Sequence, residues 1–190
     1  MPNVRGLLLA AGAGRRMGGP KALLRDDSGE AFVTRGVRVL RDGGCEGVTV
    51  VVGAAAEEVG GVLADADVAV TVAADWGSGM GASLRAGLAD PSLDGAEAVV
   101  VSLVDLPDVG KEVVRRLLGS VRTGPAALAR STYDGVPGHP VLIGRDHWAG
   151  VAATAEGDRG AREYLRAHPH VLVECGDLAT GRDTDTPESL

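Results

Sequence analysis

The chain has 190 residues, of which 45% are hydrophobic and 24% charged, and its net charge is −7. One domain typically takes ~100–200 residues, so we expect a single domain over residues 1–190, and the composition excludes wholesale disorder. No apolar run approaches the ~20 residues that cross a bilayer, the N-terminus lacks a signal-peptide pattern, and the acidic balance offers no basic surface for nucleic acid. We therefore expect a cytoplasmic protein with neither a membrane nor a nucleic-acid partner.

The first two thirds of the chain alternate between strand and helix patterns. Continuous apolar runs predict buried strands at residues 4–10, 48–52, 68–72 and 98–103. Helical patterns lie between and after them, at residues 30–40, 55–63, 80–88 and 111–118. This alternation predicts an α/β fold built on a three-layer, doubly wound and mostly parallel sheet.

The last third is less regular. Strands are expected at residues 126–130 and 141–143, with a turn at Asp134 and Gly135 between them. Asp158 is expected to cap a helix that runs to residue 168, and residues 171–175 predict a last strand. Thr186 followed by Pro187 predicts the start of a closing helix.

The first predicted strand leads into a glycine-rich loop, and residues 9–21 read LAAGAGRRMGGPK. Open α/β sheets bind ligands at the carboxyl ends of their strands, where this loop must lie. Glycines let backbone N–H groups approach phosphate oxygens, and Arg15, Arg16 and Lys21 add positive charge for a polyanion. Lys21 and Lys111 are the only lysines in the chain, so a lysine in this loop is informative.

Two common phosphate-binding loops fit this segment poorly. A dinucleotide fingerprint needs a third glycine where Met17 stands, which argues against an NAD-dependent dehydrogenase. A Walker A loop needs a hydroxyl side chain after its lysine, but Pro20 precedes Lys21 and Ala22 follows it. A glycine-rich surface turn with solvated arginines is the remaining alternative.

The loop resembles the signature L-A-A-G-x-G-x-R-M-G-x-x-K of the MobA-like nucleotidyltransferases, and the resemblance extends over nearly the whole chain. It implies a Rossmann-like nucleotidyltransferase fold, with Lys21 and Arg16 neutralising the pyrophosphate that leaves. The nucleotide-contacting residues implied for this loop are Ala10, Ala11, Gly12, Ala13, Gly14, Arg15, Arg16 and Lys21.

Residues 75–85 resemble the family's second element, which follows the third strand and opens a helix. The resemblance implies that Asp75, Gly79 and Ser83 contact the base and ribose of the nucleotide. Without the resemblance, Ser83 would be an ordinary helix residue.

The metal site is implied at two aspartates. Asp105, in Asp105-Leu106-Pro107, resembles the family's Asp-x-Pro, whose aspartate binds Mg²⁺ and serves catalysis. The C-terminal element implies a second ligand at Asp185, with Asp183 as the alternative, because neighbouring side chains on an extended segment point to opposite sides. From the residues alone, a turn or helix-cap role is an alternative to metal binding for each of these aspartates.

Two shorter segments resemble the MocA-like subgroup, which cytidylates the molybdenum cofactor. They are residues 138–142, which imply that His139 and Pro140 lie near the acceptor, and residues 157–162. The implied reaction is Mg²⁺-dependent transfer of CMP from CTP to a phosphorylated small molecule such as molybdopterin, with release of pyrophosphate. Ala10-Ala11-Gly12 favours cytidine, because the guanylyl-transferring relatives more often carry a Gly-Gly pair there.

Other functions stay open at this point. They include guanylyl transfer from GTP to the molybdenum cofactor and transfer to a sugar phosphate or an alcohol phosphate. A further alternative is a nonenzymatic, nucleotide-binding factor for molybdoenzyme maturation, with a molybdoenzyme apoprotein as its partner.

Overall fold

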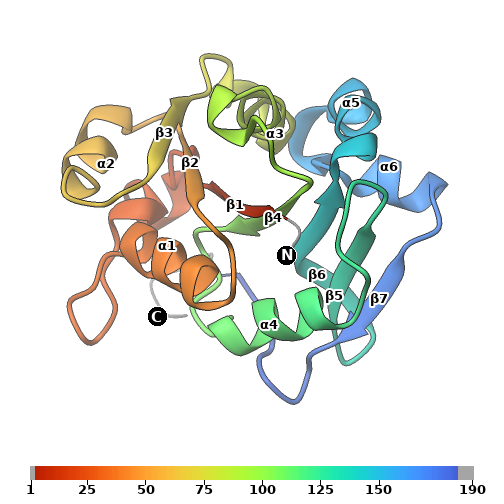
Figure 1. Cartoon of the computed structure of the whole chain (residues 1–190). Coiled ribbons are helices and arrows are strands. Elements are labelled where there is room, and N and C mark those ends of the chain that lie inside the picture. The colour runs from red at the N-terminus through yellow and green to blue at the C-terminus, as the bar shows by residue number, and fades with distance from the viewer. Residues whose placement is uncertain (1–2, 184–190) are drawn as a thin grey trace.

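A mixed, mostly parallel sheet of seven strands organises the protein, whose computed structural model describes residues 3–183. The strands lie in the order β3-β2-β1-β4-β6-β5-β7 (Figure 1). Six of them share one direction, and β6 runs antiparallel to both of its neighbours. Their bounds are β1 Val4–Leu9, β2 Val48–Val52, β3 Ala69–Val72, β4 Ala98–Leu103, β5 Leu128–Tyr133, β6 Val136–Gly144 and β7 Val171–Glu174.

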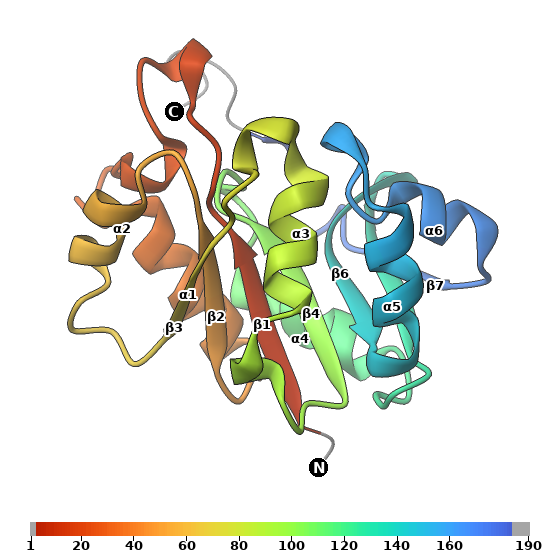
Figure 2. The same cartoon turned by 90° about the horizontal axis from the view of Figure 1, so that it is seen from above.

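Helices cover both faces of this sheet, which gives three layers (Figure 2). Apolar side chains of α1, α2 and α4 belong to one buried cluster, and those of α3, α5 and α6 belong to the other. The helices are α1 Phe32–Asp42, α2 Ala56–Val62, α3 Met80–Leu88, α4 Lys111–Gly119, α5 Arg145–Thr154 and α6 Arg162–Ala167. Five short 3₁₀ turns are η1 Arg15–Met17, η2 Lys21–Leu23, η3 Trp76–Ser78, η4 Pro91–Leu93 and η5 Gly157–Arg159.

The central strand β1 supplies both clusters, because successive side chains of a strand point to opposite faces. Leu8 packs in the cluster of α1, whereas Leu7 and Leu9 pack in the cluster of α3. A strand buried on both faces must be apolar at every position, which is why the run at residues 4–10 predicted it.

The expected alternation of strands and helices is confirmed in the first two thirds of the chain. β2, β4 and α3 have the predicted bounds, and the other elements begin or end within two residues of them. The turn at Asp134 and Gly135 is also confirmed, since both residues have positive φ angles of 50° and 78° between β5 and β6. The closing helix expected from Thr186 lies outside the described residues.

The last third differs from the expectations in two places. Helix α5 was not predicted, because only Trp148 and Val151 of its side chains are buried and the segment lacks an apolar stripe. Asp158 does not cap a long helix. It lies in η5, makes no capping hydrogen bond, and is separated from the start of α6 at Arg162.

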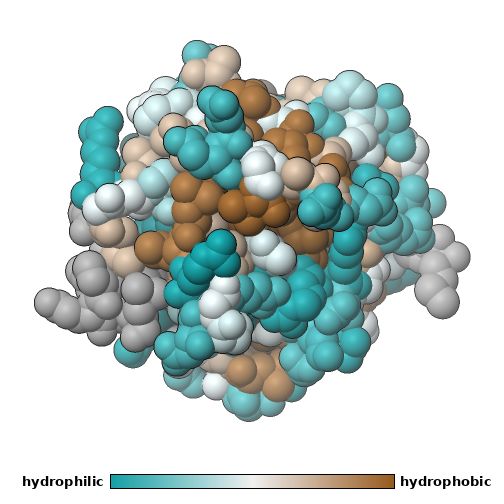
Figure 3. Space-filling view, turned by 90° about the vertical axis from the view of Figure 1, so that its left-hand side faces the viewer, coloured by the Kyte–Doolittle hydropathy of each residue, from teal (hydrophilic) through white to brown (hydrophobic). Residues whose placement is uncertain are grey.

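One edge of the sheet carries apolar surface. Val70 and Val72 of β3 and Val62 of α2 are exposed, and Figure 3 shows apolar surface on this side of the molecule. None of the helices within residues 3–183 combines the length and the apolar character needed to cross a membrane.

Glu174 at the end of β7 holds the tip of the β5–β6 hairpin. Its carboxylate accepts hydrogen bonds from the backbone N–H groups of Asp134, Gly135 and Gly176 at 2.7 to 3.0 Å, and from the Thr132 hydroxyl at 2.8 Å. The bond from Gly135, followed by that from Thr132, lowers the pKa of Glu174 from 4.5 to about 2. The carboxylate therefore stabilises the fold above its unfolded pKa, and this contribution is lost as the pH falls towards 2.

We expect Glu174→Gln to lower the melting temperature at neutral pH. The melting temperature of this variant should also depend less on pH in the acid range. An amide has only one acceptor oxygen, so it cannot satisfy four donors. Thermal unfolding followed by circular dichroism at several pH values measures both effects. Glu46→Gln is the matched control, because the exposed Glu46 side chain makes no hydrogen bond or ion pair within residues 3–183. Equal melting curves for the two variants would contradict the assigned role.

Candidate functional site

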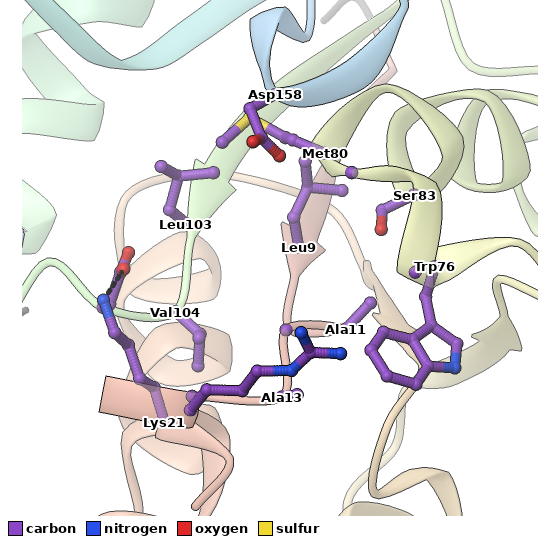
Figure 4. Close-up of a pocket in the computed structure, with 16 residues that line it drawn as sticks. Leu9, Ala11, Ala13, Lys21, Trp76, Met80, Ser83, Leu103, Val104 and Asp158 are labelled. Carbon is purple, nitrogen blue, oxygen red and sulfur yellow. Dashed lines mark hydrogen bonds and ion pairs between the residues drawn. The ribbon is translucent and has the colours of Figure 1, made fainter. Parts of the chain in front are cut away.

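A cavity of about 390 Å³ opens at the carboxyl ends of β1 and β4 (Figure 4). From β1 the chain winds outward to β2 and β3, and then returns to β4 on the other side of β1. Loops that leave two such neighbouring strands diverge, and open α/β sheets bind ligands in the resulting crevice. The cavity is lined by Leu9, Ala11, Gly12, Ala13, Gly14, Arg15, Lys21, Trp76, Gly77, Gly79, Met80, Ser83, Leu103, Val104, Asp105 and Asp158.

The glycine-rich loop forms one wall of this cavity. Gly14 has left-handed backbone angles of φ 57° and ψ 36°, and its carbonyl accepts hydrogen bonds from the N–H groups of Met17 and Gly19 at 2.9 and 3.2 Å. These bonds curl the loop back on itself before Lys21 begins η2. Of the loop residues implied to contact nucleotide, Ala11, Gly12, Ala13, Gly14, Arg15 and Lys21 line the cavity.

Lys21 and Asp105 form an ion pair in the cavity wall. The Lys21 Nζ atom lies 2.7 Å from the Asp105 Oδ2 atom, and each side chain is 17% exposed. Their elements are held together by the parallel pairing of β1 with β4, in which Leu9 is opposite Leu103, and by a 3.1 Å hydrogen bond from the Val104 N–H to the Leu9 carbonyl. Two residues 84 positions apart in the chain thus form one charged pair at the predicted edge.

The opposite wall is less charged and carries an aromatic ring. Trp76 and Ser83 lie together on one side of the cavity, whereas Lys21 lies on the other (Figure 4). The Trp76 ring fits closely because residue 53 is glycine: a Cβ there would lie 2.7 Å from both the Trp76 side chain and the Ala11 carbonyl oxygen. An indole face beside a small hydroxyl suits a flat heterocycle, which can stack on the ring.

Asp158 brings a second carboxylate into the cavity, near Met80 (Figure 4). Its segment is tied to α3 by the Arg85 guanidinium, which donates a hydrogen bond to the Ala155 carbonyl. Gly81 of α3 also lies against this carbonyl, since a Cβ at Gly81 would be 2.7 Å from the Ala155 oxygen. The expected capping residue is therefore a residue of the cavity wall.

Of the expected site residues that the structure describes, four lie outside the cavity lining. Ala10 is buried behind the loop, and Asp75 is exposed beside Trp76. His139 and Pro140 lie on β6, the strand next to β4. Burial, together with the charges of Arg130 and Arg162, lowers the pKa of His139 to about 4, so its imidazole is neutral at pH 7.

A carboxylate for a metal ion is present at Asp105. Within residues 3–183, no three His, Cys, Asp or Glu side chains are grouped as a metal site would require. Asp185 and the side chain of Arg16 lie outside the described part of the chain, and Asp183 is exposed. The segment that leads to Asp183 is tied to the loop of Asp105, because the Thr180 N–H and hydroxyl both donate to Asp108, at 2.5 and 2.6 Å.

Sequence analysis did not single out Trp76, Leu103, Val104 or Asp158 as site residues, although all four line the cavity. A signal existed for Trp76, because only 3% of the residues are aromatic and this one stands in a glycine-rich turn. The resemblance of residues 157–162 marked the segment of Asp158 but gave this residue no role at the site. Its place at the cavity depends on how η5 packs against α3.

We expect Gly14→Ala to weaken nucleotide binding about tenfold or more. A left-handed conformation costs ~1–2 kcal/mol for a residue with a Cβ atom, and this Cβ would lie 1.8 Å from the Gly19 carbonyl oxygen. Isothermal titration with each of CTP, GTP, ATP and UTP measures the affinity. Gly19→Ala is the control in the same loop, because residue 19 has no positive φ and its added Cβ would meet no atom within 4 Å. Equal affinity in the two variants would contradict the role given to the Gly14 turn.

The comparisons with known proteins agree with this architecture. The model of the MobA-like NTP transferase domain matches residues 6–171. The chain is 40% identical over its whole length to nicotine blue oxidoreductase of Paenarthrobacter nicotinovorans, of which it covers 96%. It is 36% identical to a probable molybdenum cofactor guanylyltransferase of Opitutus terrae over 66% of this chain and 59% of that protein.

A solved structure, Rv0371c from Mycobacterium tuberculosis, superposes with a TM-score of 0.78 at 28% identity, covering 99% of this chain and 95% of that one. A structure of Rv0371c in complex with manganese superposes with a TM-score of 0.72. The family model covers the glycine-rich loop, the Trp76 segment, Asp105 and Asp158, that is, every wall of the cavity. This chain belongs to the family of MobA-like NTP transferase domains.

Proposed function

We propose that residues 1–190 act as a single nucleotidyltransferase domain that transfers a nucleoside monophosphate from a nucleoside triphosphate to a phosphorylated small molecule. The observation that carries the proposal is the Lys21–Asp105 pair at the wall of a cavity bounded by the glycine-rich loop. An acceptor phosphate oxygen attacks the α-phosphorus of the triphosphate, the bond from that phosphorus to the β-bridging oxygen breaks, and pyrophosphate leaves. A phosphate monoester has a second pKa of ~6, so it is a charged nucleophile at pH 7 and needs no general base.

The charged side chains of the cavity suit this reaction. Lys21 donates hydrogen bonds to the leaving pyrophosphate, together with Arg16, and the backbone N–H groups of the loop add fixed donors for its oxygens. Arg15 also lines the cavity and adds positive charge. Binding a polyanion to a protein of net charge −7 then depends on the local charge of the loop rather than on the total.

Asp105 fits a divalent cation, which the family generally requires. Mg²⁺ is held in many phosphate-transferring sites by one or two carboxylates together with substrate phosphates, and Asp105 offers one such carboxylate in the cavity. We propose Asp185 as the second ligand, with Asp183 as the alternative. When bound, the cation would neutralise charge that develops on the phosphates. Asp105 would then contact the cation, and the Lys21 ammonium would contact the phosphates.

The Trp76 side of the cavity suits the base of the nucleotide. We propose that the base stacks on Trp76 and that Ser83, which is buried at 5% exposure, contacts it with its hydroxyl. CTP is favoured by Ala10-Ala11-Gly12, GTP is the alternative, and molybdopterin is the proposed acceptor. A pyrophosphate-release assay with CTP, GTP, ATP and UTP, each with an extract of molybdopterin and Mg²⁺, tests the proposal. Release with none of the four would overturn it.

We expect Lys21→Ala to lower kcat about 10²-fold, because a charge that faces a developing anion is lost. The same pyrophosphate assay measures it. Lys111→Ala is the matched control: Lys111 is the other lysine, it begins α4, and it is absent from the cavity lining.

We expect Asp105→Ala to remove the dependence of the rate on Mg²⁺ concentration. A Mg²⁺ titration curve identical to that of the unchanged protein would refute the metal role of Asp105.

Oxidoreductase activity is a second candidate, favoured by the 40% identity over the full length to a protein named nicotine blue oxidoreductase. In this case a reduced nicotinamide nucleotide would occupy the cavity and pass a hydride to an oxidised aromatic acceptor stacked on Trp76, and a proton from solvent would complete the reduction. The loop lacks the third glycine of a dinucleotide fingerprint at Met17, so the first candidate is preferred.

The two candidates predict opposite outcomes in one pair of assays. We expect no oxidation of NADH or NADPH above the background rate when a soluble quinone is the acceptor, measured by the absorbance of the reduced nicotinamide. Turnover of NADPH that is lost in Trp76→Ala, with no pyrophosphate released from any triphosphate, would favour the oxidoreductase instead.

A further inference from the structure

The open edge of the sheet at β3 combines free backbone groups with apolar side chains. β3 is the first strand in the sheet order, so within residues 3–183 it pairs only with β2 (Figure 1). The Ala73 N–H donates to the Val52 carbonyl of β2 at 2.9 Å. Because the N–H and C=O groups of successive strand residues point to alternate sides, those of Val70 and Val72 point away from β2, towards the open edge.

The side chains of Val70 and Val72 lie on the sheet face that carries α2. In the parallel register these residues pair with Val50 and Val52, whose side chains belong to the cluster of α1, α2 and α4. Helix α2 leaves Val70 and Val72 42% and 62% exposed, and Val62 at the end of this helix is exposed as well. Figure 3 shows apolar surface on this side of the molecule, with hydrophilic side chains around it.

The sequence of β3 contains nothing that would keep another strand away from this edge. Residues 69–72 read AVTV, without a charged residue, a proline or a glycine. On the opposite face the Thr71 hydroxyl already donates to the Asp90 carboxylate, so that side of the strand is in use. An uncharged edge with exposed valines offers hydrogen bonds and apolar contacts to one further strand, over the short length of β3.

The charge of this part of the chain is one-sided. Between Arg41 and Arg85 the sequence has no lysine or arginine but seven exposed acidic residues, which together account for the net charge of −7 of the whole chain. They are Asp42, Glu46, Glu57, Glu58, Asp65, Asp67 and Asp75. Among them only Asp67 forms an ion pair within the described chain, with Arg41 at 3.6 Å.

These charges decide which kind of strand fits the edge. Asp65 and Asp67 precede β3, Asp75 follows it, and Glu57 and Glu58 lie on α2, so carboxylates occur before and after the apolar strand. A second copy of this chain on the same edge would bring two acidic segments together, which costs free energy through repulsion of like charges. A segment with cations before and after an apolar centre would instead meet opposite charges.

We propose that β3 accepts an extended segment of a partner protein as an additional strand. The centre of this segment is apolar and packs beside Val70 and Val72, and its ends carry lysine or arginine. The backbone groups at the open edge supply the hydrogen bonds, and the acidic residues around β3 select the charge of the partner. This inference does not rest on the proposed function.

The test uses a peptide with alternating valine and threonine in its centre and lysines at both ends as the probe. Amide hydrogen exchange of the whole chain is the readout. We expect the Val70 and Val72 N–H groups to exchange rapidly in the free protein and to become protected in a saturable manner when the peptide is added. The affinity should fall as NaCl is raised, because salt screens exposed charges. Absence of protection at both residues would overturn the proposal.

Val72→Lys should weaken binding of the peptide about tenfold or more, because the new cation repels the lysines of the peptide and an apolar contact is lost. Val136→Lys is the matched control, since Val136 is an exposed valine at 66% and begins β6. Equal affinity in the two variants would contradict the assignment to the β3 edge.

Two altered peptides test the kind of contact. A peptide with prolines in place of the central valines keeps the charge but loses backbone donors, so it should not protect Val70 and Val72. A peptide with glutamates in place of the lysines should bind much more weakly. Protection by the proline peptide, or equal affinity of the glutamate peptide, would overturn the proposal.

Sedimentation velocity tests a second copy as the occupant. We expect the unchanged protein and Val72→Lys to sediment alike. A dimer that dissociates in Val72→Lys but persists in Val136→Lys would assign the edge to a second copy and overturn the proposal.

Discussion

The parallel pairing of β1 with β4 is the constraint on which the site depends. Leu9 and Leu103 are opposite each other at the ends of these strands, and the loops that leave them carry Lys21 and Asp105. The ion pair between these two side chains is partly withdrawn from water, which strengthens it relative to a surface pair and makes its loss costly unless other charges replace it. A polyphosphate would replace Asp105 as the partner of Lys21, and a divalent cation would replace Lys21 as the partner of Asp105.

The rest of the cavity is arranged around this pair by close backbone approaches. The turn at Gly14 bends the loop back towards Lys21, and the missing side chain at Gly53 leaves space for Trp76. One wall is therefore charged and rich in backbone donors, and the other offers an aromatic face and a buried hydroxyl. This polarity supports the proposed orientation of a nucleotide, with its phosphates at Lys21 and its base at Trp76.

The family contains proteins named for different chemistry, since a guanylyltransferase and an oxidoreductase are both similar to this chain. A fold of this kind supplies a crevice and a loop that grips phosphates, while the reaction depends on which groups surround the second substrate. Glu174 holds the hairpin of β5 and β6 in place with four hydrogen bonds.

The sequence by itself determined the layered fold, because strands buried on both faces must be apolar throughout and helices with one buried face must repeat their apolar residues. It also determined the glycine-rich loop, Lys21 and Asp105, whose spacing from strand ends is a local property. Only the tertiary structure decided that Asp158 lines the cavity and that α5 forms. Each of these depends on contacts between segments far apart in the chain, and such contacts leave no periodic mark in the sequence.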